Sequence, residues 1–246
     1  MTGNNSDFSS MATNIFILAL LLIHPPDTAF TIETTRIGDG FYVHTSRKIL
    51  DGQIVPSNGL VAESEDGVIV VDTPWDTAQT SQLIDWIETH LRKKVICCIV
   101  THSHEDRIGG IDAMLRRGIR VISTPLTADH ARANGISSPE PILPNDTLLT
   151  WNGLSCECFY PGKGHTDDNI VVWFPGQKIL FGGCLVKSST AGNLGNTADA
   201  DLAAWPASVL RVMAKFPDRQ IVVPGHGSWK EKMGLEHTLD LLNRER

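Results

Sequence analysis

Potential metal ligands follow four separate β-like runs of this chain, and this repeated placement constrains its fold more than any other sequence feature. One run leads into residues 102–106 (HSHED), and the others lead to His165, Cys184 and His226. Ligands and catalytic groups of α/β proteins gather beyond the carboxyl ends of strands. We therefore expect four strand ends to present six candidate ligands at one rim: His102, His104, Asp106, His165, Cys184 and His226.

Apolar β-like runs alternate with amphipathic segments from residue 30 onward. The runs predict strands at 41–43, 67–71, 95–100, 148–151, 156–160, 170–174, 179–181 and 221–223. Helical spacing of apolar residues predicts helices at 77–92 (with Asp76 as N-cap), 107–117, 127–134, 203–215 and 235–244. Two halves of this kind, with no linker rich in Pro, Gly or Ser, predict one α/β domain. In it, two packed sheets carry helices on their outer faces.

Residues 48–55 (KILDGQIV) read as a β-hairpin, because Asp51-Gly52 is a favoured two-residue turn. Both arms are apolar near the tip. Two interpretations remain open from this segment alone: a surface hairpin packed on the body, or a flap over a site.

The spacing of His102, His104 and Asp106 has a structural reason. In extended chain, residues two apart point to the same side, so this triplet forms a ligand set only in the loop before the 107–117 helix. Imidazole, thiolate and carboxylate together suit zinc. A catalytic zinc keeps three protein ligands and one open position, so six ligands divide into two sites. We therefore predict a dinuclear zinc centre.

The remaining cysteines and histidines are interpreted as structural. Cys97 and Cys98 lie mid-strand, and Cys156 and Cys158 are two residues apart, where disulfide geometry is rare. The odd number of cysteines, five, fits a single thiol held by metal. Five histidines are given no role in the site: His24 in the N-terminal segment, His44 in a strand, and His90, His130 and His237 on helices.

Composition and charge exclude several classes of protein. The chain is 41% hydrophobic and 20% charged, which is ordinary for a globular protein and unlike disordered, collagen-like or coiled-coil chains. It carries 21 Lys and Arg against 28 Asp and Glu, a net charge of −7, and has no basic tract. Phosphate binding needs clustered cations, so nucleic acid is not an expected partner.

The first 29 residues differ from the rest. Residues 15–23 (IFILALLLI) are too short an apolar run to span a bilayer, but they match the apolar part of a secretory signal. Ala29 fits a cleavage edge, although no Lys or Arg occurs before Arg36. We predict that residues 1–29 are a signal peptide and that residues 30–246 are a periplasmic or secreted domain. A disordered or membrane-tethering leader is the alternative.

The candidate ligands lie within motifs that resemble those of the metallo-β-lactamases, specifically subclass B1. The resemblance implies an αββα sandwich fold. It also implies hydrolysis of the β-lactam amide of penicillins, cephalosporins and carbapenems by attack of a zinc-bound hydroxide. The motifs that carry it are 71–75 (VDTPW), 101–110 (THSHEDRIGG), 164–169 (GHTDDN), 182–188 (GGCLVKS), 192–195 (GNLG) and 224–227 (PGHG).

Details of these motifs separate B1 from its relatives. Glyoxalase II and subclass B3 usually place a histidine where this chain has Arg107, and this chain offers Cys184 instead. Subclass B2 replaces the first histidine of the motif by asparagine, whereas this chain has His102.

The resemblance also implies roles for individual residues. It assigns His102, His104 and His165 to a first zinc ion, and Asp106, Cys184 and His226 to a second. Beyond the ligands, it implies that Asp106 orients the hydroxide, Lys187 pairs with the substrate carboxylate, Asn193 contacts the lactam carbonyl, Arg107 and Asp72 fix ligand orientation, and residues 48–55 form a mobile flap.

Two other functions compete with this interpretation. One is a thioester, lactone or phosphodiester hydrolase of the same fold, which Arg107 and Cys184 disfavour. The other is a zinc-storage protein, which an open metal position and Lys187 disfavour. The expected partner is a small-molecule β-lactam, with no nucleic acid, no membrane after leader removal, and a monomeric protein by analogy with B1 enzymes.

Overall fold

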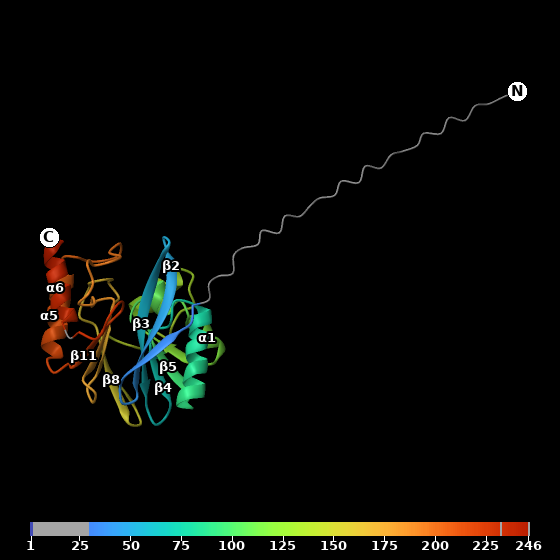
Figure 1. Ribbon diagram of the computed structural model, residues 1–246, viewed down its shortest axis with the longest axis horizontal. Helices are drawn as coiled ribbons and strands as arrows, with labels where there is room; N and C mark the ends of the chain where they lie inside the picture. Colours follow the sequence, from blue (N-terminus) through green and yellow to red (C-terminus); the bar gives the residue numbers. More distant parts are fainter. Residues whose placement is uncertain (2–29, 232, 246) are drawn as a thin grey trace.

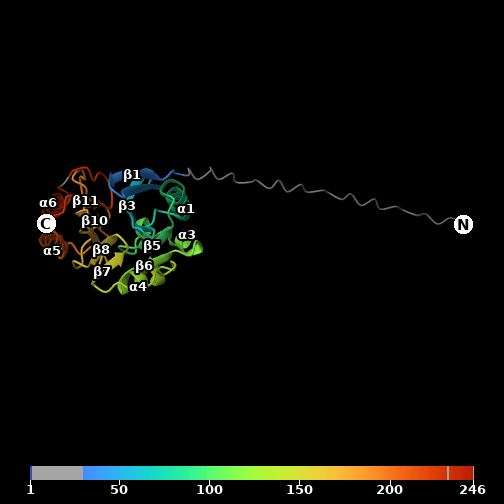
Figure 2. The ribbon, with the colours of Figure 1, turned by 90° about the horizontal axis from the view of Figure 1, so that it is seen from below.

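Two β-sheets lie face to face in the middle of the molecule, and helices cover the outer face of each (Figure 1). The structure is a computed structural model that describes Met1 and residues 30–231 and 233–245. Seen from below, α5 and α6 flank one sheet while α1 and α3 flank the other (Figure 2). This arrangement confirms the predicted sandwich of two sheets between helices.

The first sheet has six strands in sequential order, of which β1 to β4 are antiparallel and β4 to β6 are parallel. Its strands are β1 (Glu33–Gly38), β2 (Phe41–Leu50), β3 (Gln53–Glu63), β4 (Val68–Val71), β5 (Val95–Ile99) and β6 (Arg120–Ile122). Its helical segments are α1 (Thr77–Trp86), η1 (Ile87–Leu91), α2 (Glu105–Ile108), α3 (Ile111–Arg116) and α4 (Pro125–Ala133).

The second sheet has five strands in the order β11-β10-β9-β8-β7, and only β10 and β11 run parallel. Its strands are β7 (Asp146–Trp151), β8 (Leu154–Phe159), β9 (Val171–Phe174), β10 (Ile179–Gly183) and β11 (Ile221–Pro224). Its helices are α5 (Trp205–Lys215) and α6 (Gly234–Arg244).

Three apolar clusters fill the spaces between these layers. One lies between the sheets, where Phe41 of β2 meets Phe174 of β9 with ring centroids 5.0 Å apart. The other two lie under the helices on either side. Central strands such as β4 (VIVV) are buried along their whole length because both of their faces are covered. The strand ends that carry the site are therefore fixed by packing on both sides.

The helix expected over residues 77–92 begins as predicted. The Asp76 side chain accepts a hydrogen bond from the backbone N–H of Gln79 at 2.7 Å, which caps α1. The expected single helix is wrong at its end, because α-helical geometry stops at Trp86 and a short π-helical segment, η1, follows. That segment ends at Arg92 in the left-handed conformation (φ 55°).

The helix expected over residues 107–117 is two helices. The first, α2, begins at Glu105, so the expectation that Asp106 lies in an extended loop is wrong: Asp106 is in the first turn of α2, and only the backbone up to His104 is extended. α2 ends and α3 begins on either side of Gly109 and Gly110. A Cβ atom at Gly109 would collide with the Trp75 carbonyl, and one at Gly110 would collide with the Thr80 side chain. The break allows the chain to approach these neighbours closely, which a continuous helix with side chains would prevent.

The predicted hairpin is the tip of a longer one formed by β2 and β3. Asp51 (φ 50°) and Gly52 (φ 76°) form its turn, and the strands pair from Phe41 with Ala62 to Leu50 with Gln53. Strands β1 and β6 were not predicted. β1 carries mostly polar residues at a sheet edge, and β6 is only three residues long.

No helix within the described part of the chain is long and apolar enough to cross a membrane. The signal peptide predicted for residues 1–29 lies outside the described residues, Met1 excepted.

A substitution at Gly59 of β3 can test how tightly the residues behind the strand ends are packed. A Cβ atom there would overlap the ring of buried His44 and approach the Val71 carbonyl to 2.7 Å. We expect Gly59→Ala to lower the free energy of unfolding by about 1–3 kcal/mol through overpacking, measured by urea denaturation. Gly176→Ala is the control, since no atom lies within 4 Å of its added Cβ. Equal stability of the two variants would contradict the packing described.

Candidate metal centre

The six predicted ligands follow the ends of strands from both sheets. His102, His104 and Asp106 come after β5 of the first sheet. His165, Cys184 and His226 follow β8, β10 and β11 of the second. The rim expected from the sequence is therefore shared between two sheets, and the donors approach it from both sides.

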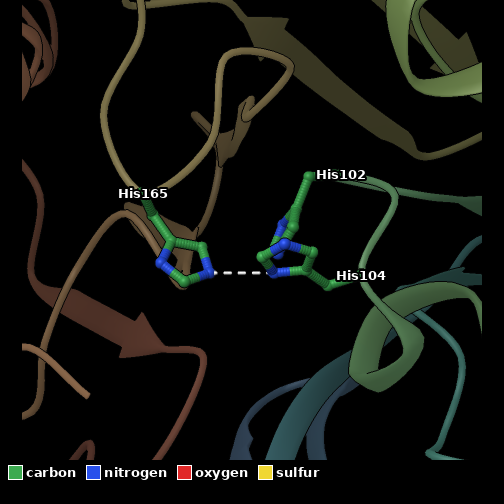
Figure 3. Close-up of side chains that lie close together, drawn as sticks. All are labelled: His102, His104 and His165. Carbon is green, nitrogen blue, oxygen red and sulfur yellow. Dashed lines mark hydrogen bonds between the residues drawn. The ribbon is translucent and has the colours of Figure 1, made fainter. Parts of the chain in front are cut away.

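His102, His104 and His165 form a triad of imidazoles whose rings face one another (Figure 3). The ring centroids are 4.9–5.1 Å apart in each pair, and His104 Nδ1 lies 3.2 Å from His165 Nε2. His102 Nε2 is buried and has no hydrogen-bond partner among the described residues. An unpaired buried nitrogen aimed at two others is the arrangement that a metal ion satisfies.

Asp106, Cys184 and His226 form a second triad. Asp106 Oδ2 lies 3.0 Å from His226 Nε2, and Cys184 Sγ lies 3.4 Å from that oxygen and 3.3 Å from that nitrogen. His226 Nδ1 contacts the Pro56 carbonyl at 2.6 Å, so a neutral ring donates there and keeps Nε2 free to bind. Three donors converge, as around a single cation.

The donor chemistry of both triads fits zinc. Ligands held by zinc bonds of about 2.0–2.3 Å in a tetrahedron lie roughly 3.3–3.8 Å apart, close to the separations found here. Nitrogen and sulfur donors disfavour magnesium and calcium, which prefer oxygen. The donor atom of His102 also lies within 4.8 Å of those of Asp106 and Cys184, so the two sites adjoin.

Burial and charge set the protonation of these donors. Burial lowers the pKa of His102 and of His165 well below the usual value, which keeps both rings in the neutral form that binds metal. Burial also disfavours the charged forms of Asp106 and His226. For these two residues, however, their contact with each other and with charged neighbours outweighs the effect of burial. Arg107 and His226 hold the Asp106 pKa well below its usual range, and Cys184 and Asp106 raise the His226 pKa to about 10.

Arg107 is fully buried beneath the second triad and binds four segments. Its guanidinium donates to Asp106 Oδ2 at 2.7–2.9 Å and to Asp72 Oδ2 at 3.3 Å. It also donates to the carbonyls of Asn58 at 2.5 Å and Gly225 at 2.8 Å. These bonds fix the Asp106 carboxylate from behind, as metal ligands generally require.

Asp72 connects the guanidinium of Arg107 to the loop that carries the first triad. It accepts hydrogen bonds from the backbone N–H and hydroxyl of Thr101, the residue before His102, at 2.7 and 2.9 Å. Its backbone is left-handed (φ 62°), which is unusual for a residue other than glycine. Burial raises its pKa to about 7, against the opposing influence of Arg107 and Thr101. A strained, buried carboxylate is thus kept where it orients the ligand loop.

A cavity of about 630 Å³ opens over the two triads, and both predicted substrate-contacting residues line it. Lys187 is 8% exposed, and its Nζ lies 5.2 Å from the centre of the Trp205 ring. Burial lowers its pKa, and no carboxylate of the described residues forms an ion pair with it. Asn193 lies in an exposed loop, where its Oδ1 accepts a hydrogen bond from Gly195 N–H at 2.9 Å.

The 48–55 hairpin borders the same cavity through Leu50 and Val55. Lys48 forms an ion pair of 2.5 Å with Glu105, the neighbour of Asp106, and Trp75 Nε1 donates to the Val55 carbonyl at 3.1 Å. Of the two interpretations left open by the sequence, this position favours a flap beside the site.

One residue of the site could not be found from the sequence. Asp199 Oδ2 lies 3.0 Å from His104 Nε2, opposite the nitrogen that faces the triad. Such a carboxylate fixes the tautomer and the ring orientation of a ligand histidine. Asp199 is 95 residues from His104 in an irregular loop, and no motif marks it.

Comparison with known proteins agrees with this geometry. The Metallo-beta-lactamase superfamily model matches residues 52–226, which include all six donors. The chain belongs to the metallo-β-lactamase superfamily. Its His-His-His and Asp-Cys-His sets are the two zinc sites of subclass B1, as the resemblance implied.

Curated relatives and solved structures support the assignment along most of the chain. Type 2 metallo-β-lactamases of Bacillus sp. (strain 170) and Bacillus cereus are 46% and 45% identical over 212 residues, which is 86% of this chain and 82% and 83% of theirs. A solved metallo-β-lactamase from Pontibacter korlensis is 44% identical with a TM-score of 0.84, covering 87% of this chain and 99% of that one.

The division of ligands predicts the zinc content of a variant. Cys184→Ala removes the thiolate of the second triad and leaves the three histidines intact, so we expect bound zinc to fall from two ions per chain toward one. Metal analysis after equilibrium dialysis measures this. Cys158→Ala, which removes another buried thiol between the sheets, is the control and should keep both ions. Two ions in Cys184→Ala would show that the division is wrong.

Proposed function

We propose that this protein is a zinc-dependent β-lactamase that opens the β-lactam amide of penicillins, cephalosporins and carbapenems. The observation that carries the proposal is the pair of adjoining donor triads at the base of a cavity, with a buried, unpaired lysine in its wall. Zinc held by these triads supplies a Lewis acid for the lactam carbonyl and activates water at neutral pH.

Lys187 binds the substrate carboxylate in this proposal. A buried ammonium group without an anionic partner is costly, and an anionic substrate in the cavity provides that partner. Because β4 to β11 hold the donors in place, the bound carboxylate fixes the distance from the lactam ring to the triads. Lys187 therefore orients substrate as well as attracting it.

Asp106 and Asn193 act at the reacting amide. Arg107 keeps the Asp106 carboxylate ionised and immobile, so Asp106 orients the attacking water toward the carbonyl carbon. Asn193 lines the same cavity, and in this proposal its side-chain amide contacts the lactam carbonyl oxygen. Both residues thus position groups in the transition state.

The hairpin covers the apolar side of the substrate. Ile49, Leu50 and Ile54 near its tip are 50%, 39% and 59% exposed, which leaves apolar surface available next to the cavity. Closure of this flap buries that surface against substrate and excludes bulk water from the triads.

The location follows from the N-terminal sequence. We propose that residues 1–29 direct export and are removed, and that the domain of residues 30–246 acts as a monomer in the periplasm. Its substrates are small molecules that reach it there.

Turnover of imipenem by the purified protein tests the function. We expect hydrolysis, monitored as loss of the carbapenem absorbance. A chelator should abolish this hydrolysis, and added zinc should restore it. A protein with two bound zinc ions that hydrolyses no penicillin, cephalosporin or carbapenem would overturn the proposal. A thioester or lactone substrate turned over in its place would indicate another hydrolase of this family.

Lys187→Ala tests the anion-binding role. A hydrogen bond to a charged group contributes about 1.5–3 kcal/mol, so we expect kcat/KM for imipenem to fall roughly 10- to 150-fold, mostly through KM. Lys187→Arg keeps the charge and should recover part of the loss. Lys94→Ala, at an exposed position outside the cavity, is the control. An unchanged KM in Lys187→Ala would place the carboxylate elsewhere.

A further inference from the structure

A third group of metal-ligand side chains lies beside the two triads. His130 extends from α4, and Asp167 and Asp168 follow closely after the ligand His165. His130 Nε2 lies 2.8 Å from Asp167 Oδ1, and the donor atoms of all three residues lie within 4.8 Å of one another. None of the three belongs to the zinc sites described above.

Asp168 is the residue that indicates a ligand here. It is 1% exposed, and one of its oxygens accepts a hydrogen bond from the Ser103 backbone N–H at 2.9 Å. The other oxygen, Oδ1, is buried and has no hydrogen-bond partner among the described residues. A buried carboxylate oxygen without a partner is costly, and a cation bound between Asp168 and its neighbours would remove that cost.

The surroundings suit a hydrated cation. A cavity of about 770 Å³ adjoins the cluster and gives room for water ligands. Asp199 and Asp201 line it, and Lys163 is the single lysine or arginine in its described wall. This excess of carboxylates attracts positive charge. His104 and Asp199 line both this cavity and the one above the triads, so the cluster adjoins the first zinc site.

We propose that His130, Asp167 and Asp168 bind a third zinc ion, with water completing its coordination. One imidazole and two carboxylates match zinc better than magnesium or calcium, which take oxygen ligands. The third site binds more weakly than the two triads, because it has no thiolate and His130 and Asp167 are partly exposed. It does not depend on the proposed reaction, since binding is measured without substrate.

Equilibrium dialysis of the full chain against rising zinc concentration, followed by metal analysis, tests the site. The unchanged protein should bind two zinc ions first and a third at higher concentration. His130→Ala and Asp167→Asn should each weaken the third step at least about tenfold, since even indirect partners of a metal contribute 10- to 100-fold to affinity. Asp168 is left unchanged because it also holds the Ser103 backbone.

His90→Ala is the matched control, because it removes an exposed histidine from η1, away from the cluster. It should keep the third binding step. Circular dichroism and retention of the first two zinc ions establish that each of these variants is folded. If either His130→Ala or Asp167→Asn does not fold, the other still tests the site. Cys184→Ala should lose the zinc ion of the second triad but keep the third binding step. This result would show that the third site is independent of the second triad.

Two results would overturn the proposal. One is saturation of the unchanged protein at two zinc ions up to millimolar zinc. The other is an equal zinc affinity for the third step in His130→Ala, Asp167→Asn and His90→Ala. That result would show that the additional zinc binds at dispersed surface positions. A protein that hydrolyses no β-lactam yet shows the third step would refute the function and leave this site standing.

Discussion

The buried guanidinium of Arg107 is the interaction on which the arrangement of the site depends. It contacts a carbonyl of β3, the carboxylate of Asp72 just after β4, a carboxylate of α2 and a carbonyl just after β11, so it joins the two sheets at the rim where the donors meet. Removing one partner from a buried ion pair typically costs about 3–5 kcal/mol, because the remaining charge has no water to replace it. The position of Asp106 is thus tied to the stability of the whole rim.

The ligands of the two triads differ in their protonation and charge when no metal is bound. In the first triad, burial lowers the pKa of His102 and of His165 and keeps these two imidazoles uncharged, and His102 Nε2 has no hydrogen-bond partner among the described residues. The second triad holds acidic groups and a histidine of raised pKa, in contact with a fixed cation. A metal entering the first site finds ligands ready, whereas one entering the second displaces protons.

The sequence alone was sufficient to predict the layers of the fold and the six donors. Strand-end placement is a local pattern, and the glycines next to His165 and His226 mark turns, so the pattern is visible without a structure. The break between α2 and α3 was missed because it results from close contacts of Gly109 and Gly110 with distant Trp75 and Thr80. Asp199 was missed for the same reason: only the folded chain brings it to His104.

The hairpin is held at its base by two contacts of different character. The Lys48–Glu105 ion pair is partly exposed and contributes about 0–1 kcal/mol, while Trp75 is buried and bonds the backbone of the other arm. The base stays attached through the aromatic ring even when the ion pair opens. If the hairpin acts as the proposed flap, these contacts leave residues 49–54 as the part free to move, so the tip could adjust to β-lactams of different bulk while the metal ligands keep their places.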